Sequence, residues 1–220
     1  MGVRELAAAM RGVINSAALA QKDNGVKFEP FNQYLMGYDA QYQDWLGAGM
    51  CRGLPVKYPV CQKSKEKFTG IVNAKSMNTF KLDKTGKLRA DNPLQDEIFA
   101  AAVAGDTDGV GEAKDFYDFM KEKYKFKHDT TKSFTDGREA IDFATDTGKY
   151  SVILIPHHAM AAAGLADKSK AFLEPNCGII TVSKEGFLTA VDDFFSHDFV
   201  QKTYKMQDPK FSFTVHRFKT

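Results

Sequence analysis

Cys51 has the sequence context of a reactive thiol. It follows Gly47 and Gly49, and this pattern predicts a tight turn that opens a helix, with Pro55 in the first helical turn. A thiol acts as a nucleophile in its thiolate form, which the partial positive charge and free N–H groups of a helix N-terminus favour. Burial as a small apolar side chain is the common alternative for a free cysteine. Cys51 is therefore a candidate nucleophile.

The other two cysteines have weaker support. Cys61 lies one helix length further on, after Pro59, and its position predicts a core residue. Cys177 follows Asn176 in an expected turn that could expose it, and it has no base beside it in the sequence. An odd number of cysteines, three, leaves at least one thiol free in a monomer, which favours a reducing compartment.

The adjacent pair His157 and His158 is the best source of a general base. We expect a strand over residues 150–156 that continues through 157–163. Adjacent side chains of a strand point to opposite faces, so one of the two histidines would face a cleft. The alanines that follow leave room for another element to approach, and a purely structural histidine is the alternative.

Glu174 and Asn176 are candidates for the group that orients the base. Glu174 follows His158 by 16 residues, and the turn chemistry of residues 167–170 would bring the two segments together as antiparallel strands. A carboxylate or amide oxygen that accepts from the imidazole fixes its tautomer. The alternative is a simple turn at Pro175 and Asn176.

The elements that would position these residues fall into two groups. Helical spacing precedes strand-like alternation along the chain, so the fold class is α+β with an antiparallel sheet. We expect helices over residues 3–21, 91–104, 112–124, 135–145 (with Asp136 as a possible N-cap) and 184–195, and strands over 171–174, 178–182 and 210–218.

Composition is that of an ordinary globular domain. The 220 residues are 43% hydrophobic, 12% aromatic and 26% charged, which excludes a disordered or low-complexity chain and permits a sizeable core. The formal net charge of +2 gives no reason to expect a nucleic-acid partner. The first residues do not form a classical signal peptide, because charged residues interrupt the apolar run.

Charge is unevenly distributed in the middle of the chain. Residues 57–89, from Lys57 to Arg89, hold nine basic and two acidic side chains, and residues 91–118 hold eight acidic side chains and one lysine. Two solvated faces packed against each other would explain this pattern. The alternative is a basic patch that contacts an anionic membrane or a partner.

Three motifs together resemble the YopT/AvrPphB-type papain-like cysteine peptidases. These motifs are Gly49-Met50-Cys51, the pair His158-Ala159, and Phe172-Leu173-Glu174-Pro175-Asn176 before Gly178. In that family a G-x-C sequence opens the central helix, HA follows a strand, and F-F-D-P-N-x-G supplies the acid. The resemblance extends from about residue 45 to the end and is most specific over residues 172–178.

The resemblance implies a role for each matching residue. Cys51 would be the nucleophile, His158 the base and Glu174 the acid, where the family is expected to have Asp; Asn176 is the alternative third member. Papain-like enzymes also place a side-chain amide shortly before the cysteine to bind the oxyanion. Trp45 stands six residues before Cys51 and cannot do so, which leaves Gln43, or Gln41, beside the Cys51 backbone N–H.

The resemblance also implies the domain plan and the activity. It implies one catalytic domain over residues 1–220, with a helical extension (1–44), a helical subdomain (45–148) and an antiparallel sheet subdomain (149–220). Its central helix would carry the nucleophile at its N-terminus, packed on the sheet. The activity would be hydrolysis of peptide bonds in a protein target, without cofactor or metal, by a monomeric bacterial effector or toxin that acts in the cytoplasm of a target cell.

Two other functions remain open. A glutamine deamidase or an acyltransferase on the same fold would use the same three residues. A non-enzymatic interaction module would instead use the basic segment 57–89 and leave Cys51 and His158 inert.

Overall fold

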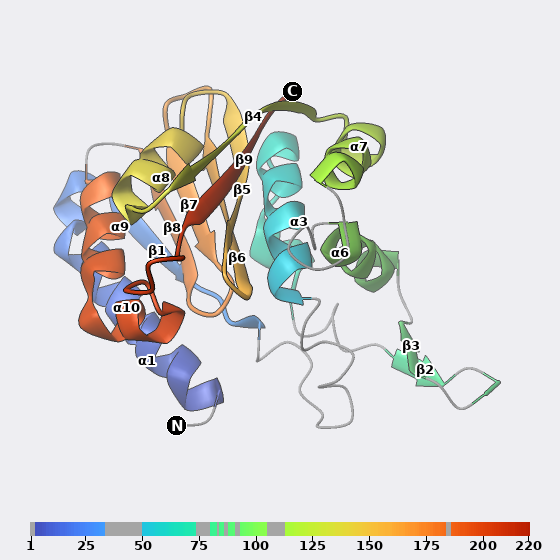
Figure 1. The fold of residues 1–220 in the computed structure, drawn as a ribbon, viewed down its shortest axis with the longest axis horizontal. Coiled ribbons are helices and arrows are strands. Elements are labelled where there is room, and N and C mark those ends of the chain that lie inside the picture. Colours follow the sequence, from blue (N-terminus) through green and yellow to red (C-terminus); the bar gives the residue numbers. More distant parts are fainter. Residues whose placement is uncertain are drawn as a thin grey trace.

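The core of the molecule is a seven-stranded antiparallel sheet (Figure 1). A computed structural model of the chain describes residues 3–33, 50–73, 80–82, 84–85, 88–90, 93–104, 113–183 and 186–220. Within these residues the strand order is β1-β8-β7-β6-β5-β9-β4. The strands are β1 (Val26–Pro30), β4 (Lys127–Phe134), β5 (Lys149–Ile155), β6 (His158–Gly164), β7 (Lys170–Glu174), β8 (Gly178–Val182) and β9 (Phe213–Lys219).

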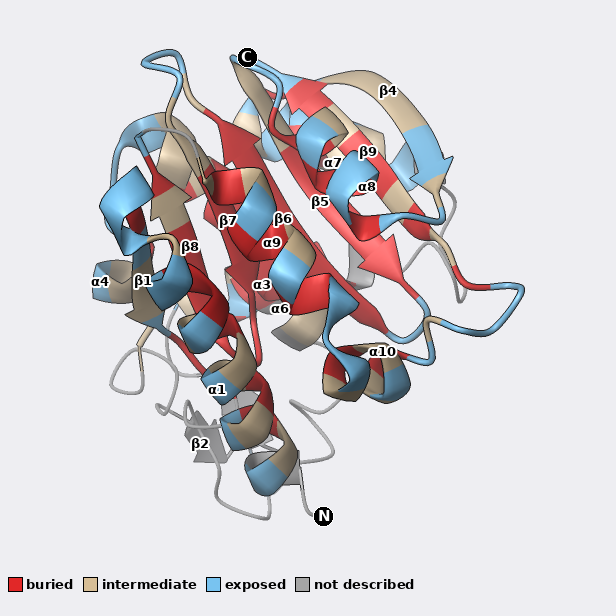
Figure 2. Cartoon of the chain, turned by 90° about the vertical axis from the view of Figure 1, so that its left-hand side faces the viewer, coloured by how far each residue is buried: buried red, intermediate tan, exposed pale blue. Residues whose placement is uncertain are grey.

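The central strands are buried on both faces, as Figure 2 shows. Successive side chains alternate between the two sides: Val152 and Leu154 belong to one apolar cluster, and Ile153 and Ile155 belong to another. Every residue of β6 is buried. A sheet whose middle is apolar on both faces needs a helical layer on each side.

The two helical layers differ in composition (Figure 1). One layer contains α1 (Val3–Ala20), α8 (Gly137–Ala144), α9 (Phe187–Ser196) and α10 (Asp198–Tyr204). The other contains α3 (Met50–Ser64), α6 (Pro93–Ala104) and α7 (Ala113–Tyr124), with α3 directly against β6 and β5. The smaller elements are η1 (Lys22–Asn24), α4 (Phe68–Ile71) and a separate hairpin of β2 (Phe80–Leu82) and β3 (Leu88–Ala90).

Small residues allow α3 to pack closely against its neighbours. On the sheet side, Ala161 shares a cluster with Leu54 and Tyr58 of α3, and Ala159 shares one with Val56. On the other side, a Cβ placed on Gly53 would lie 2.1 Å from the Ile98 carbonyl oxygen of α6. Any side chain at Gly53 would therefore push the two helices apart.

The structure confirms the α+β class and the expected helices. Asp136 caps α8, since its carboxylate accepts the backbone N–H of Glu139 at 2.8 Å. The predicted boundaries of the sheet were wrong, because β1 lies within residues 1–44 and β4 within residues 45–148. Pro55 was also misplaced, because it lies inside α3 and has no N–H to offer the Cys51 carbonyl four residues earlier.

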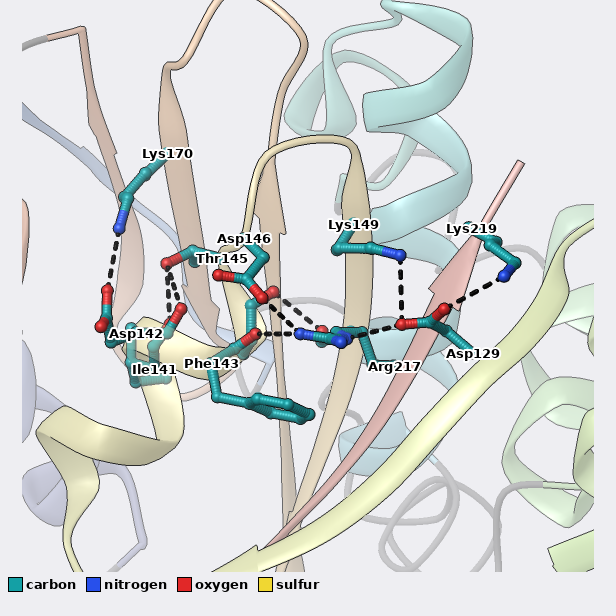
Figure 3. Close-up of polar contacts among 12 residues, drawn as sticks. Asp129, Ile141, Asp142, Phe143, Thr145, Asp146, Lys149, Lys170, Arg217 and Lys219 are labelled. Carbon is teal, nitrogen blue, oxygen red and sulfur yellow. Dashed lines mark hydrogen bonds and ion pairs between the residues drawn. The ribbon is translucent and has the colours of Figure 1, made fainter.

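An ion-pair network ties β4, β5 and β9 together (Figure 3). The Asp129 carboxylate is paired with Lys149 (3.1 Å), Arg217 (2.9 Å) and Lys219 (3.2 Å). Burial opposes ionisation of Asp129, but the three cations outweigh it and lower the pKa of the carboxyl group to about 2. Arg217 also bonds to Asp146, so the network extends to the loop that precedes β5.

Replacing Asp129 by asparagine is expected to lower the free energy of unfolding by about 1–3 kcal/mol, because three cations lose their counter-charge. In the wild type, the contribution of Asp129 to the free energy of unfolding is complete above pH 3.8, the ordinary pKa of this carboxyl group, and is lost as the pH falls towards about 2. Chemical denaturation of the wild type and of Asp129→Asn at several pH values measures this difference in the free energy of unfolding. Asp142→Asn is the matched control, since its pair with Lys170 is exposed and should contribute less than about 1 kcal/mol. An equal loss in both variants would contradict the prediction.

Candidate active site

His158 is the first residue of β6 and follows a two-residue turn. β5 and β6 form a hairpin in which Ile155 pairs with His158, so Pro156 and His157 make the connection. His157 has a positive φ of 61° and is exposed. The expectation of one continuous strand through both histidines was therefore wrong. His157 is exposed because it lies in the turn, and His158 is buried because it lies in the strand.

Cys51 lies in the first turn of α3 and meets His158. The thiol and the imidazole are in hydrogen-bond contact, although the two residues are 107 positions apart in the chain. In the first turn of a helix the backbone N–H groups have no intrahelical acceptor and carry partial positive charge. The structure therefore has the contact between the Cys51 sulfur and the His158 imidazole that the sequence predicted.

Glu174 ends β7 and holds the other side of the imidazole. The expected antiparallel pairing of β6 with β7 is confirmed, and it brings the Glu174 carboxylate to His158 Nε2. Nδ1 is then the ring nitrogen left for the thiol. Glu174 has one methylene more than the aspartate expected from the resemblance. The structure accommodates the longer side chain, since its carboxylate contacts the imidazole and both groups are buried.

The Glu174 carboxylate accepts from donors besides His158. Oε1 accepts the Tyr204 hydroxyl at 2.8 Å, Oε2 accepts the Asn176 backbone N–H at 2.8 Å, and the Cys177 thiol also bonds to this carboxylate. A fully buried carboxylate is stable when its lone pairs are satisfied in this way. Cys177 is therefore buried and bonded to Glu174, not exposed in a turn as the sequence had suggested.

The charges of His158 and Glu174 depend on each other. Burial disfavours the imidazolium, but the Glu174 carboxylate and the contact with Cys51 raise the pKa of His158 to about 9. Burial likewise opposes ionisation of Glu174, yet His158, Cys177 and Tyr204 outweigh it and hold the pKa of the carboxyl group below its usual value. At neutral pH the arrangement favours an imidazolium beside a carboxylate.

Asn176 supports this arrangement through other partners. Its side chain accepts the Gln33 amide at 2.5 Å and bonds to the Tyr204 hydroxyl. Of the two candidates for the third member, Glu174 contacts the imidazole, and Asn176 contacts Glu174 through its backbone N–H.

The amide candidates for the oxyanion lie in a part of the chain without described structure. Gln43 and Gln41 fall in residues 34–49, outside the described residues. Gln33 is described and buried, and its backbone N–H donates to the Pro175 carbonyl at 2.8 Å. Its Oε1 has no hydrogen-bond partner among the described residues. No sequence pattern pointed to Gln33, because its partners lie more than 140 positions away.

Tyr204 is a second residue that the sequence did not indicate. It belongs to α10, and its ring stacks on the His158 imidazole with centroids 5.2 Å apart and planes 14° from parallel. The same residue donates its hydroxyl to Glu174. Tyr204 therefore covers the bond between imidazole and carboxylate and helps to keep the carboxylate ionised.

Replacing Tyr204 by phenylalanine keeps the stacked ring and removes one donor from Glu174. If His158 acts as proposed below, we expect turnover to fall about 3- to 10-fold, consistent with the loss of one hydrogen bond to a charged group. The pKa of Glu174 should rise towards its usual value, which moves the acid limb of the pH–rate profile upward. Tyr117→Phe is the matched control, since that hydroxyl bonds to Thr131 and His216 away from this site. An unchanged acid limb in Tyr204→Phe would contradict the expected role.

Lysines of the basic segment already have partners within the molecule. Lys57 pairs with Glu97 of α6 at 2.9 Å, and Lys67 pairs with Glu29 at 2.9 Å. Lys63 donates to the Tyr124 carbonyl and lies over the Phe126 ring. The pair between Lys57 and Glu97 joins the basic segment to the acidic one, as expected for two faces packed against each other.

Membrane-spanning helices and clustered metal ligands are not found in the described residues. No helix in the described part of the chain is both long and apolar enough to cross a membrane. In the same residues, no three or more His, Cys, Asp or Glu side chains are grouped so as to hold a metal ion.

Comparison with known proteins adds no family assignment. No protein-family model matches the chain, and no curated protein matches it.

Proposed function

We propose that the protein is a papain-like cysteine peptidase whose nucleophile, base and orienting acid are Cys51, His158 and Glu174. The contact of the Cys51 thiol with an imidazole held by a buried carboxylate carries the proposal. A thiol, a base within hydrogen-bond reach and a third group that orients the base are the parts of a covalent acyl-transfer site. The sequence resemblance supports the same three residues independently of the geometry.

The reaction follows from the positions of the three groups. The Cys51 thiolate attacks the carbonyl carbon of the scissile amide, and in this proposal the Cys51 backbone N–H donates to the oxyanion that forms. The C–N bond then breaks while the His158 imidazolium gives its proton to the leaving amine. A water molecule next attacks the thioester carbonyl, gives one proton to His158, and releases the acid and the thiolate.

Glu174 acts on His158 throughout these steps. It binds Nε2, which fixes the ring with Nδ1 towards sulfur, and its charge stabilises the imidazolium. Tyr204, Cys177 and the Asn176 backbone N–H keep that charge in place. Asn176 and Tyr204 are thus positioning residues.

Alkylation of Cys51 tests the pairing directly. At about pH 6 iodoacetamide should modify Cys51 at least about 10-fold faster in the wild-type protein than in His158→Ala, because the thiolate needs the imidazolium. Mass spectrometry of the digested protein gives the rate at each cysteine. Buried Cys61 and Cys177 serve as internal references. Equal rates at Cys51 in the two proteins would refute the proposal.

A deamidase or acyltransferase would pass the same alkylation test, because it needs the same thiolate. Product masses separate these reactions: cleavage gives two fragments, whereas deamidation adds about one dalton to an intact target. The partners found for Lys57, Lys63 and Lys67 do not favour the third function, an interaction module built on the basic segment. On the resemblance alone, we extend the proposal to a bacterial effector that acts on a protein inside a target cell.

A further inference from the structure

A pocket of about 440 Å³ lies next to the imidazole. Its walls come from α1, from α10 with the segment that follows it, and from the turn between β5 and β6. α1 and α10 belong to the same helical layer and lie towards the same end of the sheet in Figures 1 and 2. The apolar residues of its lining, called the floor below, are Leu6, Ala7, Met10, Pro156 and Phe211. The volume is within the range typical of ligand sites in proteins.

The pocket is on the imidazole side of the proposed reaction centre. His158 and Asn176 are among its lining residues, and Cys51 is not. During acyl transfer the acyl part of the substrate becomes bonded to sulfur, and the amine part receives its proton from the imidazole. A peptide segment in this pocket would therefore belong to the leaving-group side of the scissile bond.

The exposed charged residues of the lining, called the rim below, carry an excess of positive charge. Lys205 and Lys210 line the pocket together with His157 and a single carboxylate, that of Asp208. The Asp208 carboxylate accepts the backbone N–H of Lys210 at 2.8 Å. Neither lysine ammonium group forms an ion pair with another described residue, so both are available to an incoming anion. The apolar floor and the cationic rim together fit an apolar group that has a negative charge beside it.

We propose that this pocket binds a substrate segment on the leaving-group side, with a large apolar side chain on the floor and an adjacent Asp or Glu at Lys205 and Lys210. The inference rests on the proposed function for its place in the reaction. The binding preference itself follows from the pocket and can be measured without catalysis.

Direct binding to the Cys51→Ala protein tests the preference. Three fluorescein-labelled peptides serve as probes, Ala-Phe-Glu-Ala, Ala-Phe-Lys-Ala and Ala-Ala-Glu-Ala, and fluorescence anisotropy reports the affinity. The first should bind at least about 5-fold more tightly than either of the others, because each of the others lacks one of the two favourable interactions. The double substitution K205E/K210E should remove the preference for the Glu peptide and reverse it in favour of the Lys peptide.

Lys202→Glu is the matched control, because Lys202 lies on α10 but is not among the residues that line the pocket. It should leave the order of the three affinities unchanged. Equal binding of the three peptides, or a preference that survives K205E/K210E, would overturn the inference.

Cleavage of a proteome-derived peptide mixture then separates the two proposals. New N-termini that require Cys51 should begin with a large apolar residue next to Asp or Glu, and K205E/K210E should remove the acidic preference. Cys51-dependent cleavage without that preference overturns the inference and leaves the peptidase. Absence of Cys51-dependent cleavage overturns the peptidase, and the binding result still decides whether the pocket prefers these peptides.

Discussion

Cys51→Ala will lower the rate of peptide cleavage at least about 10³-fold, which is the scale of loss expected when a covalent nucleophile is removed. In the proposed reaction the thiol is the group that attacks the carbonyl carbon, and His158 has nothing to activate without it. The measurement is the appearance of new N-termini in a mixture of proteome-derived peptides, quantified by mass spectrometry over several hours.

Cys61→Ala is the matched control for this loss. Cys61 lies on the same helix ten residues further on, is fully buried, and belongs to the cluster with Tyr58 and Phe68. Its removal should reduce stability, as expected for a small cavity in a core, while turnover stays within about 2-fold. A Cys51→Ala protein that cleaves as fast as the Cys61→Ala protein would exclude Cys51 as the nucleophile.

Glu174→Gln will remove the counter-charge of the buried imidazolium, while the glutamine side chain keeps almost the same shape as the glutamate. Burial then opposes the imidazolium with only the contact to Cys51 against it, so the pKa of His158 should fall well below about 9. A larger share of the imidazole is then neutral at pH 7 and supports the thiolate less. Turnover should decrease about 10²- to 10⁴-fold, the range found for loss of an orienting acid.

The same substitution should change how stability depends on pH. His158 has a raised pKa, so its contribution is complete below pH 6.5 and disappears as the pH rises through about 9. Glu174 has a lowered pKa, so its contribution is present above pH 4.5 and disappears as the pH falls through the lower folded value. The wild type should therefore exceed Glu174→Gln in Tm most between pH 4.5 and 6.5, and the difference should shrink towards pH 9.

Glu97→Gln provides the comparison for both effects. Glu97 also has a lowered pKa and bonds to Lys57 and Tyr124, but it lies on α6 and has no contact with His158. It should reduce stability without moving the titration of His158, which NMR of the imidazole carbons reports. If the His158 titration in Glu174→Gln matched that of the wild type, the carboxylate would not be the group that sets it.

The parts of this structure that local chemistry determines could be predicted from the sequence. The helix α8 is predictable because Asp136 is a good N-cap, and the hairpin of β6 and β7 because residues 167–170 favour a turn. Cys51, His158 and Glu174 could be selected together because their motifs resemble those of a known peptidase family, whereas each residue taken alone also had a structural interpretation. The predicted helix at Cys51 and the predicted hairpin of the two strands with His158 and Glu174 were enough to bring the three side chains together.

Other parts depend on contacts that no local pattern encodes. β1 alternates apolar and polar side chains for only four residues before Pro30, which is too short a pattern to predict a strand, and β4 is a polar strand; both lie at the edges of the sheet. Tyr204 and Gln33 reach the site from elements distant in the sequence. The turn at His157 was missed because a residue with positive φ there is usually glycine or asparagine.

The alanines of β6 have a consequence for the chemistry at the strand's first residue. Ala159 and Ala161 separate α3 from the sheet by little more than their methyl groups, and α3 carries the sulfur while β6 carries the imidazole. Because alanine has a small side chain, we expect the packing distance between α3 and β6, and with it the gap between the Cys51 sulfur and the His158 imidazole, to depend on these two positions. A graded series at Ala161, from glycine through alanine to valine, would therefore adjust the reaction rate from a position that touches neither atom.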